Sequence, residues 1–126
     1  MTGPFPLATV GDGAVAIRFA DSAPSEWVRV KCVLDLNGLG EPVGIEVLDW
    51  RRQLGGAILD APKASATARW AYDDEIDAIS IHLAPGTAPV QRSAWAAVGL
   101  DSRRRVVSLD LRLPGPGHTE TEPRTD

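Results

Sequence analysis

A short β-type pattern occurs twice in the chain, and the second copy lies at a constant offset of 64 positions from the first. Residues 14–20 match residues 78–84, and residues 43–47 match residues 107–111. Apolar and polar residues keep the same phase in both copies, and a period of two places alternate side chains on opposite faces of a strand. The repeat therefore predicts two similar β-units that bury equivalent faces.

The two units are predicted at 14–50 and 70–113, each as an antiparallel meander of three to four strands, so the chain is predicted to be mainly β. Residues 51–69 separate them, and Gly55 and Gly56 disfavour a long helix there, because glycine costs about 1 kcal/mol relative to alanine within a helix. We expect a short helical or irregular crossover. Units of roughly 40 residues rarely bury enough apolar surface alone. The two units should therefore pack together as a pseudo-twofold sandwich or small barrel.

The two ends of the chain lack this alternation. Residues 1–13 contain Pro4, Pro6 and a glycine-rich stretch, and are predicted as an irregular lead-in. Residues 114–126 begin with alternating proline and glycine and continue with polar residues, which predicts a disordered tail. The predicted ordered part is thus the two β-units and their crossover.

Charge and hydropathy argue against two classes of partner. The net charge is −4, and the basic run from Arg103 to Arg105 falls where a hairpin turn is expected, so no nucleic-acid contact is predicted. No apolar run approaches the roughly 20 residues that cross a bilayer, and the first residues lack the basic and apolar segments of a secretion signal. We therefore expect a cytoplasmic protein with no membrane contact.

The single cysteine, Cys32, agrees with that expectation. One cysteine forms no disulfide within the chain and offers no cysteine cluster for zinc. Cys32 shares the phase of apolar Val30 and Leu34, which predicts a buried thiol rather than a nucleophile. Arginine far outnumbers lysine, and alanine, glycine and proline are abundant, a composition that indicates a GC-rich bacterial source.

Two segments resemble the motifs of a known bacterial family. Residues 72–83 resemble the opening motif of the domain-of-unknown-function family 2283 (DUF2283), and residues 34–49 resemble its closing motif. The first unit lacks the acidic opening motif, and the second departs from the closing motif at Gly99 and Ser108. The resemblance implies a small antiparallel β-fold, usually present once per chain and paired between chains, so that two fused copies would form a pseudo-dimer. It implies no established activity, and the toxin-like genes beside some family members imply a binding role.

The offset also matches outward residues of the two units, in the pairs Arg18 and His82, Glu46 and Asp110. If the first and last strands of each unit are neighbours, Arg18 faces Glu46 in one unit. His82 then faces Asp110 in the other. A histidine beside a carboxylate could act in general acid–base catalysis, but it is also an ordinary cross-strand contact. We favour the contact, and keep His82, Asp110 and Glu46 as the candidate catalytic residues of an enzyme.

The acidic segment at 73–77 is a candidate for a cation site. Its carboxylates could offer oxygen ligands to a divalent cation, but it lacks the glycine and the distal glutamate of an EF-hand loop. Aspartate commonly forms turns before strands, and a turn is the prediction here. His82 is the single histidine of the two units, and no glycine-rich phosphate loop occurs, so neither a metal nor a cofactor is predicted.

Four tryptophans offer the largest side-chain surfaces. Trp27 and Trp95 fall out of phase with the apolar faces of their strands, and aromatic side chains displaced from a core are typical of binding surfaces. Our leading hypothesis is a non-catalytic interaction module that contacts a protein partner or a second copy of itself. The contact would use an exposed strand edge or the face that carries Trp27, Trp95 and Arg18.

The alternative hypothesis is a small β-barrel or sandwich that binds an organic small molecule in an apolar cavity and could cyclise or isomerise it. Ala94 and Ala96 stand where the first unit has Val30 and Cys32, so the core could be filled or hollow at this layer. The residues predicted to line such a cavity are Trp27, Trp95, His82 and Asp110. Whether the chain is an enzyme is left open by the sequence.

Overall fold

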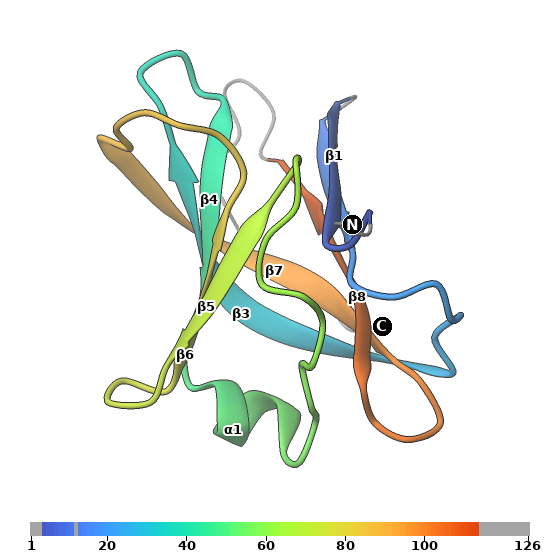
Figure 1. Ribbon diagram of the computed structural model, residues 1–126. Coiled ribbons are helices and arrows are strands. Elements are labelled where there is room, and N and C mark those ends of the chain that lie inside the picture. The colour runs from blue at the N-terminus through green and yellow to red at the C-terminus, as the bar shows by residue number, and fades with distance from the viewer. Residues whose placement is uncertain (1–3, 12, 114–126) are drawn as a thin grey trace.

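The computed structural model describes residues 4–11 and 13–113, which form eight antiparallel strands and one short helix (Figure 1). The prediction of a mainly β protein is confirmed. In chain order the elements are β1 (Leu7–Gly11), β2 (Ala14–Arg18), β3 (Glu26–Leu36), β4 (Pro42–Val47), α1 (Trp50–Leu54), β5 (Arg69–Asp73), β6 (Ala78–His82), β7 (Val90–Leu100) and β8 (Val106–Arg112).

All eight strands belong to one sheet, in the order β1-β2-β8-β7-β3-β4-β6-β5. The two longest strands, β3 and β7, lie at its centre and pair over their full eleven residues, from Glu26 opposite Leu100 to Leu36 opposite Val90. Strong twist curls the sheet into a half-barrel, as the changing strand directions in Figure 1 show. The predicted β-units therefore share one continuous sheet.

The strands of the two units interleave within this sheet. β2 of the first unit pairs with β8 of the second unit, and β6 of the second unit pairs with β4 of the first unit. The expectation that the first and last strands of one unit are neighbours is wrong, because β2 and β6 each pair with a strand of the other unit. The reason is that β3 and β7 occupy the centre as a full-length pair, which leaves β8 and β4 with open outer edges for β2 and β6.

The strand order maps onto itself when β1–β4 are exchanged with β5–β8. The registers agree as well: Ile17 lies opposite Leu109, and Ile45 lies opposite Ile81, which is the same pairing shifted by 64 positions on both strands. The sheet thus has the symmetry that the sequence repeat requires. A duplication event as its origin stays a prediction.

The lead-in was predicted to be irregular, but residues 7–11 form the edge strand β1. Its side chains carry no alternation because Leu7, Thr9 and Val10 are exposed and only Ala8 packs against the core. An edge strand without a buried face leaves no period-two signal. The tail predicted at 114–126 lies outside the described residues.

The inward side chains of the strands pack into one apolar cluster, which Trp50 and Leu54 of α1 join from one end of the half-barrel (Figure 1). Ala94 and Ala96 are buried in the same cluster as the larger residues of β3. Cys32 is buried, as predicted. No helix within residues 4–11 and 13–113 is long and apolar enough to cross a membrane.

A tight hairpin at residues 63–70 ties the two edges of the sheet together. The Trp70 amide donates a hydrogen bond to the Lys63 carbonyl (2.8 Å), which places this segment along β5. Its tip contacts β1, where the Ala8 amide donates to Thr67 Oγ1 (2.9 Å) and the Ser65 hydroxyl donates to the Pro6 carbonyl. Both sheet edges are therefore partly satisfied, which reduces their availability for strand addition.

The crossover combines the two forms that were predicted for it. The helix α1 spans five residues and ends at Gly55, which has a positive φ of 60°. The Gln53 side-chain amide pairs with the backbone of Lys31, as donor to its carbonyl (2.9 Å) and acceptor from its amide (2.6 Å). The pairing of β3 with β4 begins only at Val33, so β4 does not reach Lys31. The Gln53 side chain supplies the hydrogen bonds that a neighbouring strand would make there.

Candidate functional site

The six candidate side chains from the sequence analysis all lie on the outer face of the sheet. Alternation along each strand places them there, opposite the inward residues of the core. They therefore line no interior cavity of the half-barrel. Their strands are β2 for Arg18, β3 for Trp27, β4 for Glu46, β6 for His82, β7 for Trp95 and β8 for Asp110.

The charged candidates pair across units rather than within them. Register places His82 opposite Gly44, so it is the diagonal neighbour of Glu46; the pKa of Glu46 is raised, by burial first and then by Asp35, and His82 only opposes this rise. Likewise Arg18 lowers the pKa of Asp110, although burial, the larger effect, raises it. The expectation that His82 faces Asp110 and Arg18 faces Glu46 is wrong, because β2 and β6 exchange partners.

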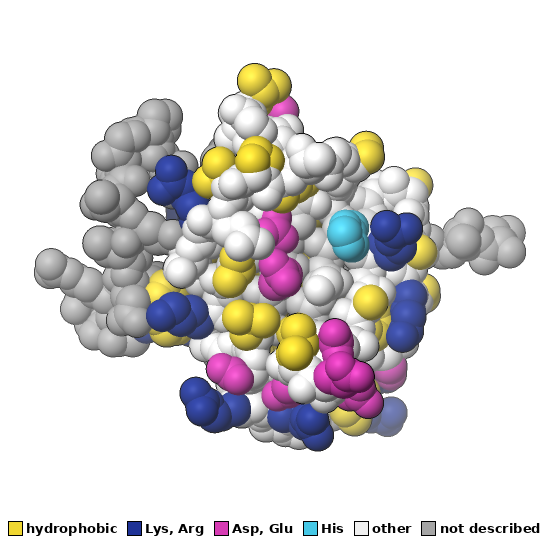
Figure 2. Space-filling model, turned by 90° about the vertical axis from the view of Figure 1, so that its left-hand side faces the viewer, with side chains coloured by type: hydrophobic (Ala, Val, Ile, Leu, Met, Phe, Trp, Pro, Cys, Tyr) yellow, Lys and Arg dark blue, Asp and Glu magenta, His cyan; other side chains and the backbone are white. Residues whose placement is uncertain are grey.

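One group of polar residues forms a pocket of about 230 Å³ on this face. We call it the His82 cluster. At its centre Gly44 separates Asp35 on β3 from His82 on β6, since it pairs with Asp35 on one side and His82 on the other. In Figure 2 the imidazole is the cyan side chain, with acidic side chains across a white patch on one side of it and a basic side chain on the other. The members of the cluster are Asp35, Gly44, Glu46, Ser80 and His82.

Gly44 makes room for the carboxylate of Asp35. A Cβ at this position would lie 3.2 Å from Asp35 Oδ2 and 3.2 Å from the Ile81 carbonyl oxygen. The other carboxylate oxygen, Asp35 Oδ1, accepts a hydrogen bond from Gln91 Nε2 (2.9 Å). Asp35 is therefore held over the glycine and close to Glu46.

Glu46 and Asp35 form a carboxyl pair. Partial burial raises the pKa of Glu46, and the charge of Asp35 and a hydrogen bond with it raise the pKa further, whereas His82 opposes the shift. Such a pair holds a proton to a higher pH than an isolated glutamate. Sequence reasoning missed Asp35; the available signal was its outward phase between Leu34 and Leu36, opposite a glycine. Within the described residues, no group of His, Cys, Asp and Glu side chains has the arrangement of a metal site.

A second polar cluster occupies the equivalent place on the other half of the sheet, and we call it the Arg18 cluster. The Arg18 guanidinium donates hydrogen bonds to the carbonyls of Ala20 (3.0 Å) and Ser22 (3.1 Å) in the loop that follows β2. Pro24 from this loop covers Gly99, which would carry a Cβ only 2.8 Å from the proline ring. The members of this cluster are Ala16, Arg18, Gly99, Ser108 and Asp110.

Trp95 lies at the centre of the outer face, where β7 pairs with β3 and Lys31 is directly opposite. The Arg29 guanidinium packs over the indole, 5.2 Å from its centroid. Trp95 borders a groove of about 620 Å³ toward β2 and β8 and another of about 410 Å³ toward α1. We call this surface the Trp95 face; its charged residues are Arg29, Lys31, Asp49, Arg52, Asp110 and Arg112.

Trp27 is 51% exposed and lies at the end of β3 beside Gly99, outside the lining of both grooves. The two predicted binding tryptophans therefore face the same side of the sheet without forming one site. The other two, Trp50 and Trp70, are each 6% exposed and border a separate pocket beside the crossover.

The acidic segment at 73–77 forms the turn between β5 and β6. The Glu75 amide donates a hydrogen bond to Asp73 Oδ1 (3.0 Å), which is the side-chain turn expected of aspartate. Asp77 adopts a positive φ of 52° and accepts a hydrogen bond from the Tyr72 hydroxyl (2.6 Å). These contacts account for two of the carboxylates.

Comparison with known proteins adds no relative: no family model, no curated protein and no solved structure matches this chain. The resemblance to the domain-of-unknown-function family 2283 accordingly stays a prediction that rests on the motifs in the sequence.

Proposed function

We propose that the chain is a non-catalytic interaction module whose Trp95 face binds an extended, acidic segment of a partner protein. The observation that carries this proposal is the charge around Trp95. Four cationic and two acidic side chains border its grooves, although the chain as a whole has a net charge of −4. Electrostatic complementarity then favours a negatively charged partner.

The side chains on this face suit protein contact. Tryptophan and arginine carry much of the binding energy in protein interfaces, above all when they lie near the centre of the patch. Trp95 is half-buried between two grooves, so its ring is held in place and a bound segment could enclose it from both sides. Gln53 fixes the backbone beneath one groove through its bonds to Lys31.

Two other modes of contact have less support. Strand addition needs an open sheet edge, and the hairpin at 63–70 already bonds to both β1 and β5. A symmetric contact between two copies through the Trp95 face would bring its cations against one another. A separate partner with an acidic segment is therefore the proposed occupant. The single buried Cys32 suits a reducing compartment, and we propose a cytoplasmic location.

Selection of peptides from a random displayed library tests the proposal. The wild-type protein should enrich acidic sequences, and affinity for them should fall as salt is raised, since the contacts are exposed. Trp95→Ala should lower the affinity for the selected peptides by about tenfold or more, as expected for a central tryptophan.

Two matched variants control for general effects. Trp27→Ala removes the other outward tryptophan, which lies on the same side of the sheet but outside the Trp95 face, and Arg103→Gln removes an exposed cation in the turn between β7 and β8. Both should bind as wild type does. Enrichment of neutral or basic peptides, or equal loss in Trp27→Ala and Trp95→Ala, would overturn the proposal.

A further inference from the structure

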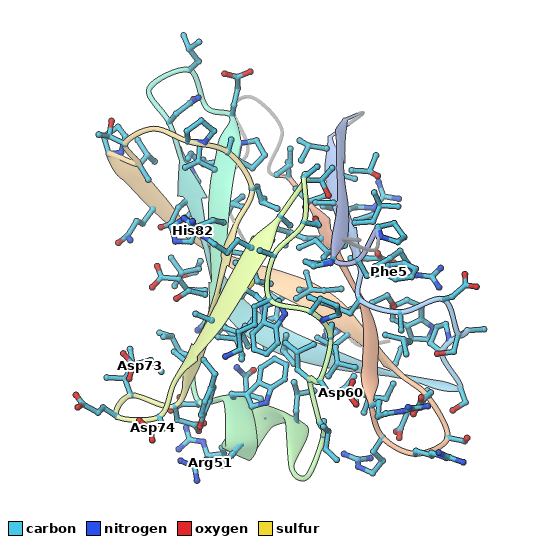
Figure 3. The ribbon with its side chains drawn as sticks, viewed as in Figure 1. Phe5, Arg51, Asp60, Asp73, Asp74 and His82 are labelled. Carbon is cyan, nitrogen blue, oxygen red and sulfur yellow. The ribbon has the colours of Figure 1, made fainter. Side chains whose placement is uncertain are left out.

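A fourth cavity, of about 360 Å³, lies between α1, the crossover and the β5–β6 hairpin, and we call it the crossover pocket. Figure 3 labels Arg51 on α1, Asp74 in the hairpin turn and Asp60 on the crossover, all at this end of the molecule. The volume falls in the range typical of small-molecule sites, roughly 300–1,000 Å³. It shares no lining residue with the grooves beside Trp95.

Aromatic and aliphatic side chains form most of the wall. Trp50, Trp70 and Ile79 belong to the buried core, and Leu59 packs against it from the crossover. The orientation of one indole is fixed, because Trp70 Nε1 donates a hydrogen bond to the Pro62 carbonyl (2.9 Å). The pocket thus offers a rigid aromatic wall of the kind that binds flat apolar groups.

Two cations stand at the rim of this apolar wall. The Lys63 ammonium lies 5.1 Å from the centroid of the Trp70 ring and is otherwise exposed. The Arg51 guanidinium contacts Asp77 through Nε (3.3 Å), and its remaining N–H donors are on the two terminal nitrogens. A ligand with an apolar ring and an anionic group would satisfy both features at once.

Asp74 also lines the pocket and places one negative charge at its rim, and Asp77 lies outside the lining, beside Arg51. The Asp77 carboxylate accepts hydrogen bonds from the Tyr72 hydroxyl (2.6 Å) and from the backbone amide of Arg51 (3.0 Å), in addition to the contact with the guanidinium. The Tyr72 bond lowers the pKa of Asp77 most, and Arg51 lowers it further. Both oxygens of the Asp77 carboxylate are thus already engaged, whereas Lys63 forms no salt bridge within the described residues.

We propose that the crossover pocket binds a small aromatic carboxylic acid, with its ring against Trp50 and Trp70 and its carboxylate at Lys63 and Arg51. The site is independent of the Trp95 face, so either proposal can fail without the other. Binding here would take a ligand of one or two rings, in keeping with the size of the cavity.

Nuclear magnetic resonance of the four indole N–H groups tests the site directly. The probes are benzoate, indole-3-acetate and naphthalene-2-carboxylate, each compared with its neutral amide. An acid that binds as proposed shifts the indole resonances of Trp50 and Trp70 and leaves those of Trp27 and Trp95 in place. The amides should bind at least about tenfold more weakly, a difference of about 1.4 kcal/mol.

Charge variants separate recognition from folding. Lys63→Gln should lower the affinity for the acid by about tenfold and leave the affinity for its amide unchanged. Lys63→Arg should keep most of the wild-type affinity for the acid. Arg103→Gln, in an exposed turn, is the matched control and should behave as wild type. The proposal is overturned if no acid of the set shifts Trp50 and Trp70, if acid and amide bind alike, or if Lys63→Gln has no effect.

Discussion

The His82 cluster and the Arg18 cluster occupy equivalent places in the sheet but differ in structure. One is an open pocket of about 230 Å³ that contains a carboxyl pair and an exposed histidine. The other is closed by Pro24, and its arginine is bonded to the loop that follows β2. The strands that carry the two clusters differ, but they pair in equivalent registers.

The two clusters differ in which of two paired strands carries the glycine and which carries the larger side chain. In the open cluster Asp35 on β3 lies over Gly44 on β4, whereas in the closed cluster Gly99 on β7 makes room for Ser108 on β8. Inward residues fix the register, because a slip by one residue would turn the apolar face outward. Outward residues are free of this constraint, so one cluster can serve packing while the other keeps a polar pocket.

The largest expected contrast concerns the two glycines. Gly99→Ala would place a Cβ 2.5 Å from Ser108 Oγ and 2.8 Å from Pro24, and should lower the free energy of unfolding by about 3 kcal/mol. Gly44→Ala meets its nearest atoms at 3.2 Å and should cost about 1 kcal/mol. Urea unfolding of both variants measures the difference. Equal losses would contradict the distinction between closed and open clusters.

A smaller effect of opposite sign is expected at Ser108. Its hydroxyl is buried and has no hydrogen-bond partner in the described structure, and an unpaired buried hydroxyl costs free energy. Ser108→Ala should therefore raise the free energy of unfolding by about 1 kcal/mol. Ser80→Ala, in the open cluster, should change it by less than about 0.5 kcal/mol. A clear loss of stability in Ser108→Ala would show that the hydroxyl has a partner after all.

The smallest expected effect is on proton binding. Asp35→Asn removes the charge that helps to raise the pKa of Glu46, so that pKa should fall toward its ordinary value, as measured by carboxyl resonances across a pH series. A raised pKa means that the folded state binds the proton more tightly than the unfolded state. In the wild type, the stabilisation that Glu46 contributes to the folded state is therefore present at low pH and is lost as the pH rises through the raised pKa.

Asp35→Asn should weaken this loss of stability with rising pH. Asp110 is the internal control, because its pKa is raised by burial and lowered by Arg18, with no contribution from Asp35. An unchanged pKa of Glu46 in Asp35→Asn would show that burial alone sets it.

Local patterns predicted the faces of the strands well. The period of two identified the inward residues of β2, β3, β4, β6, β7 and β8, and placed Trp27, Trp95, His82 and Glu46 outside. β1 was not predicted because its side chains are almost all exposed and show no alternation of apolar and polar residues. A pattern is readable only where one face of an element is buried.

Neighbour relations were harder to predict. Which strand borders β2 depends on the full-length pairing of β3 with β7, a contact between distant segments that neither segment reveals alone. For the same reason the partner of His82 was assigned to Asp110 instead of Glu46, and Asp35 was not singled out. The crossover pocket was also missed, since Trp50, Lys63 and Trp70 meet only after the hairpin at 63–70 has folded back.

The interleaving of β2 with β8 and of β6 with β4 has a consequence for how the chain acquires its structure. Ile17 and Leu109 lie 92 positions apart, yet they face each other in adjacent strands. Such contacts close large loops late and slow folding, and they prevent a nascent first half from completing its own sheet. If the two halves were separate chains, each would lend its first strands to the other, as in a domain-swapped dimer. Removal of either half would therefore take strands out of the single sheet and leave the remaining strands with unpaired edges.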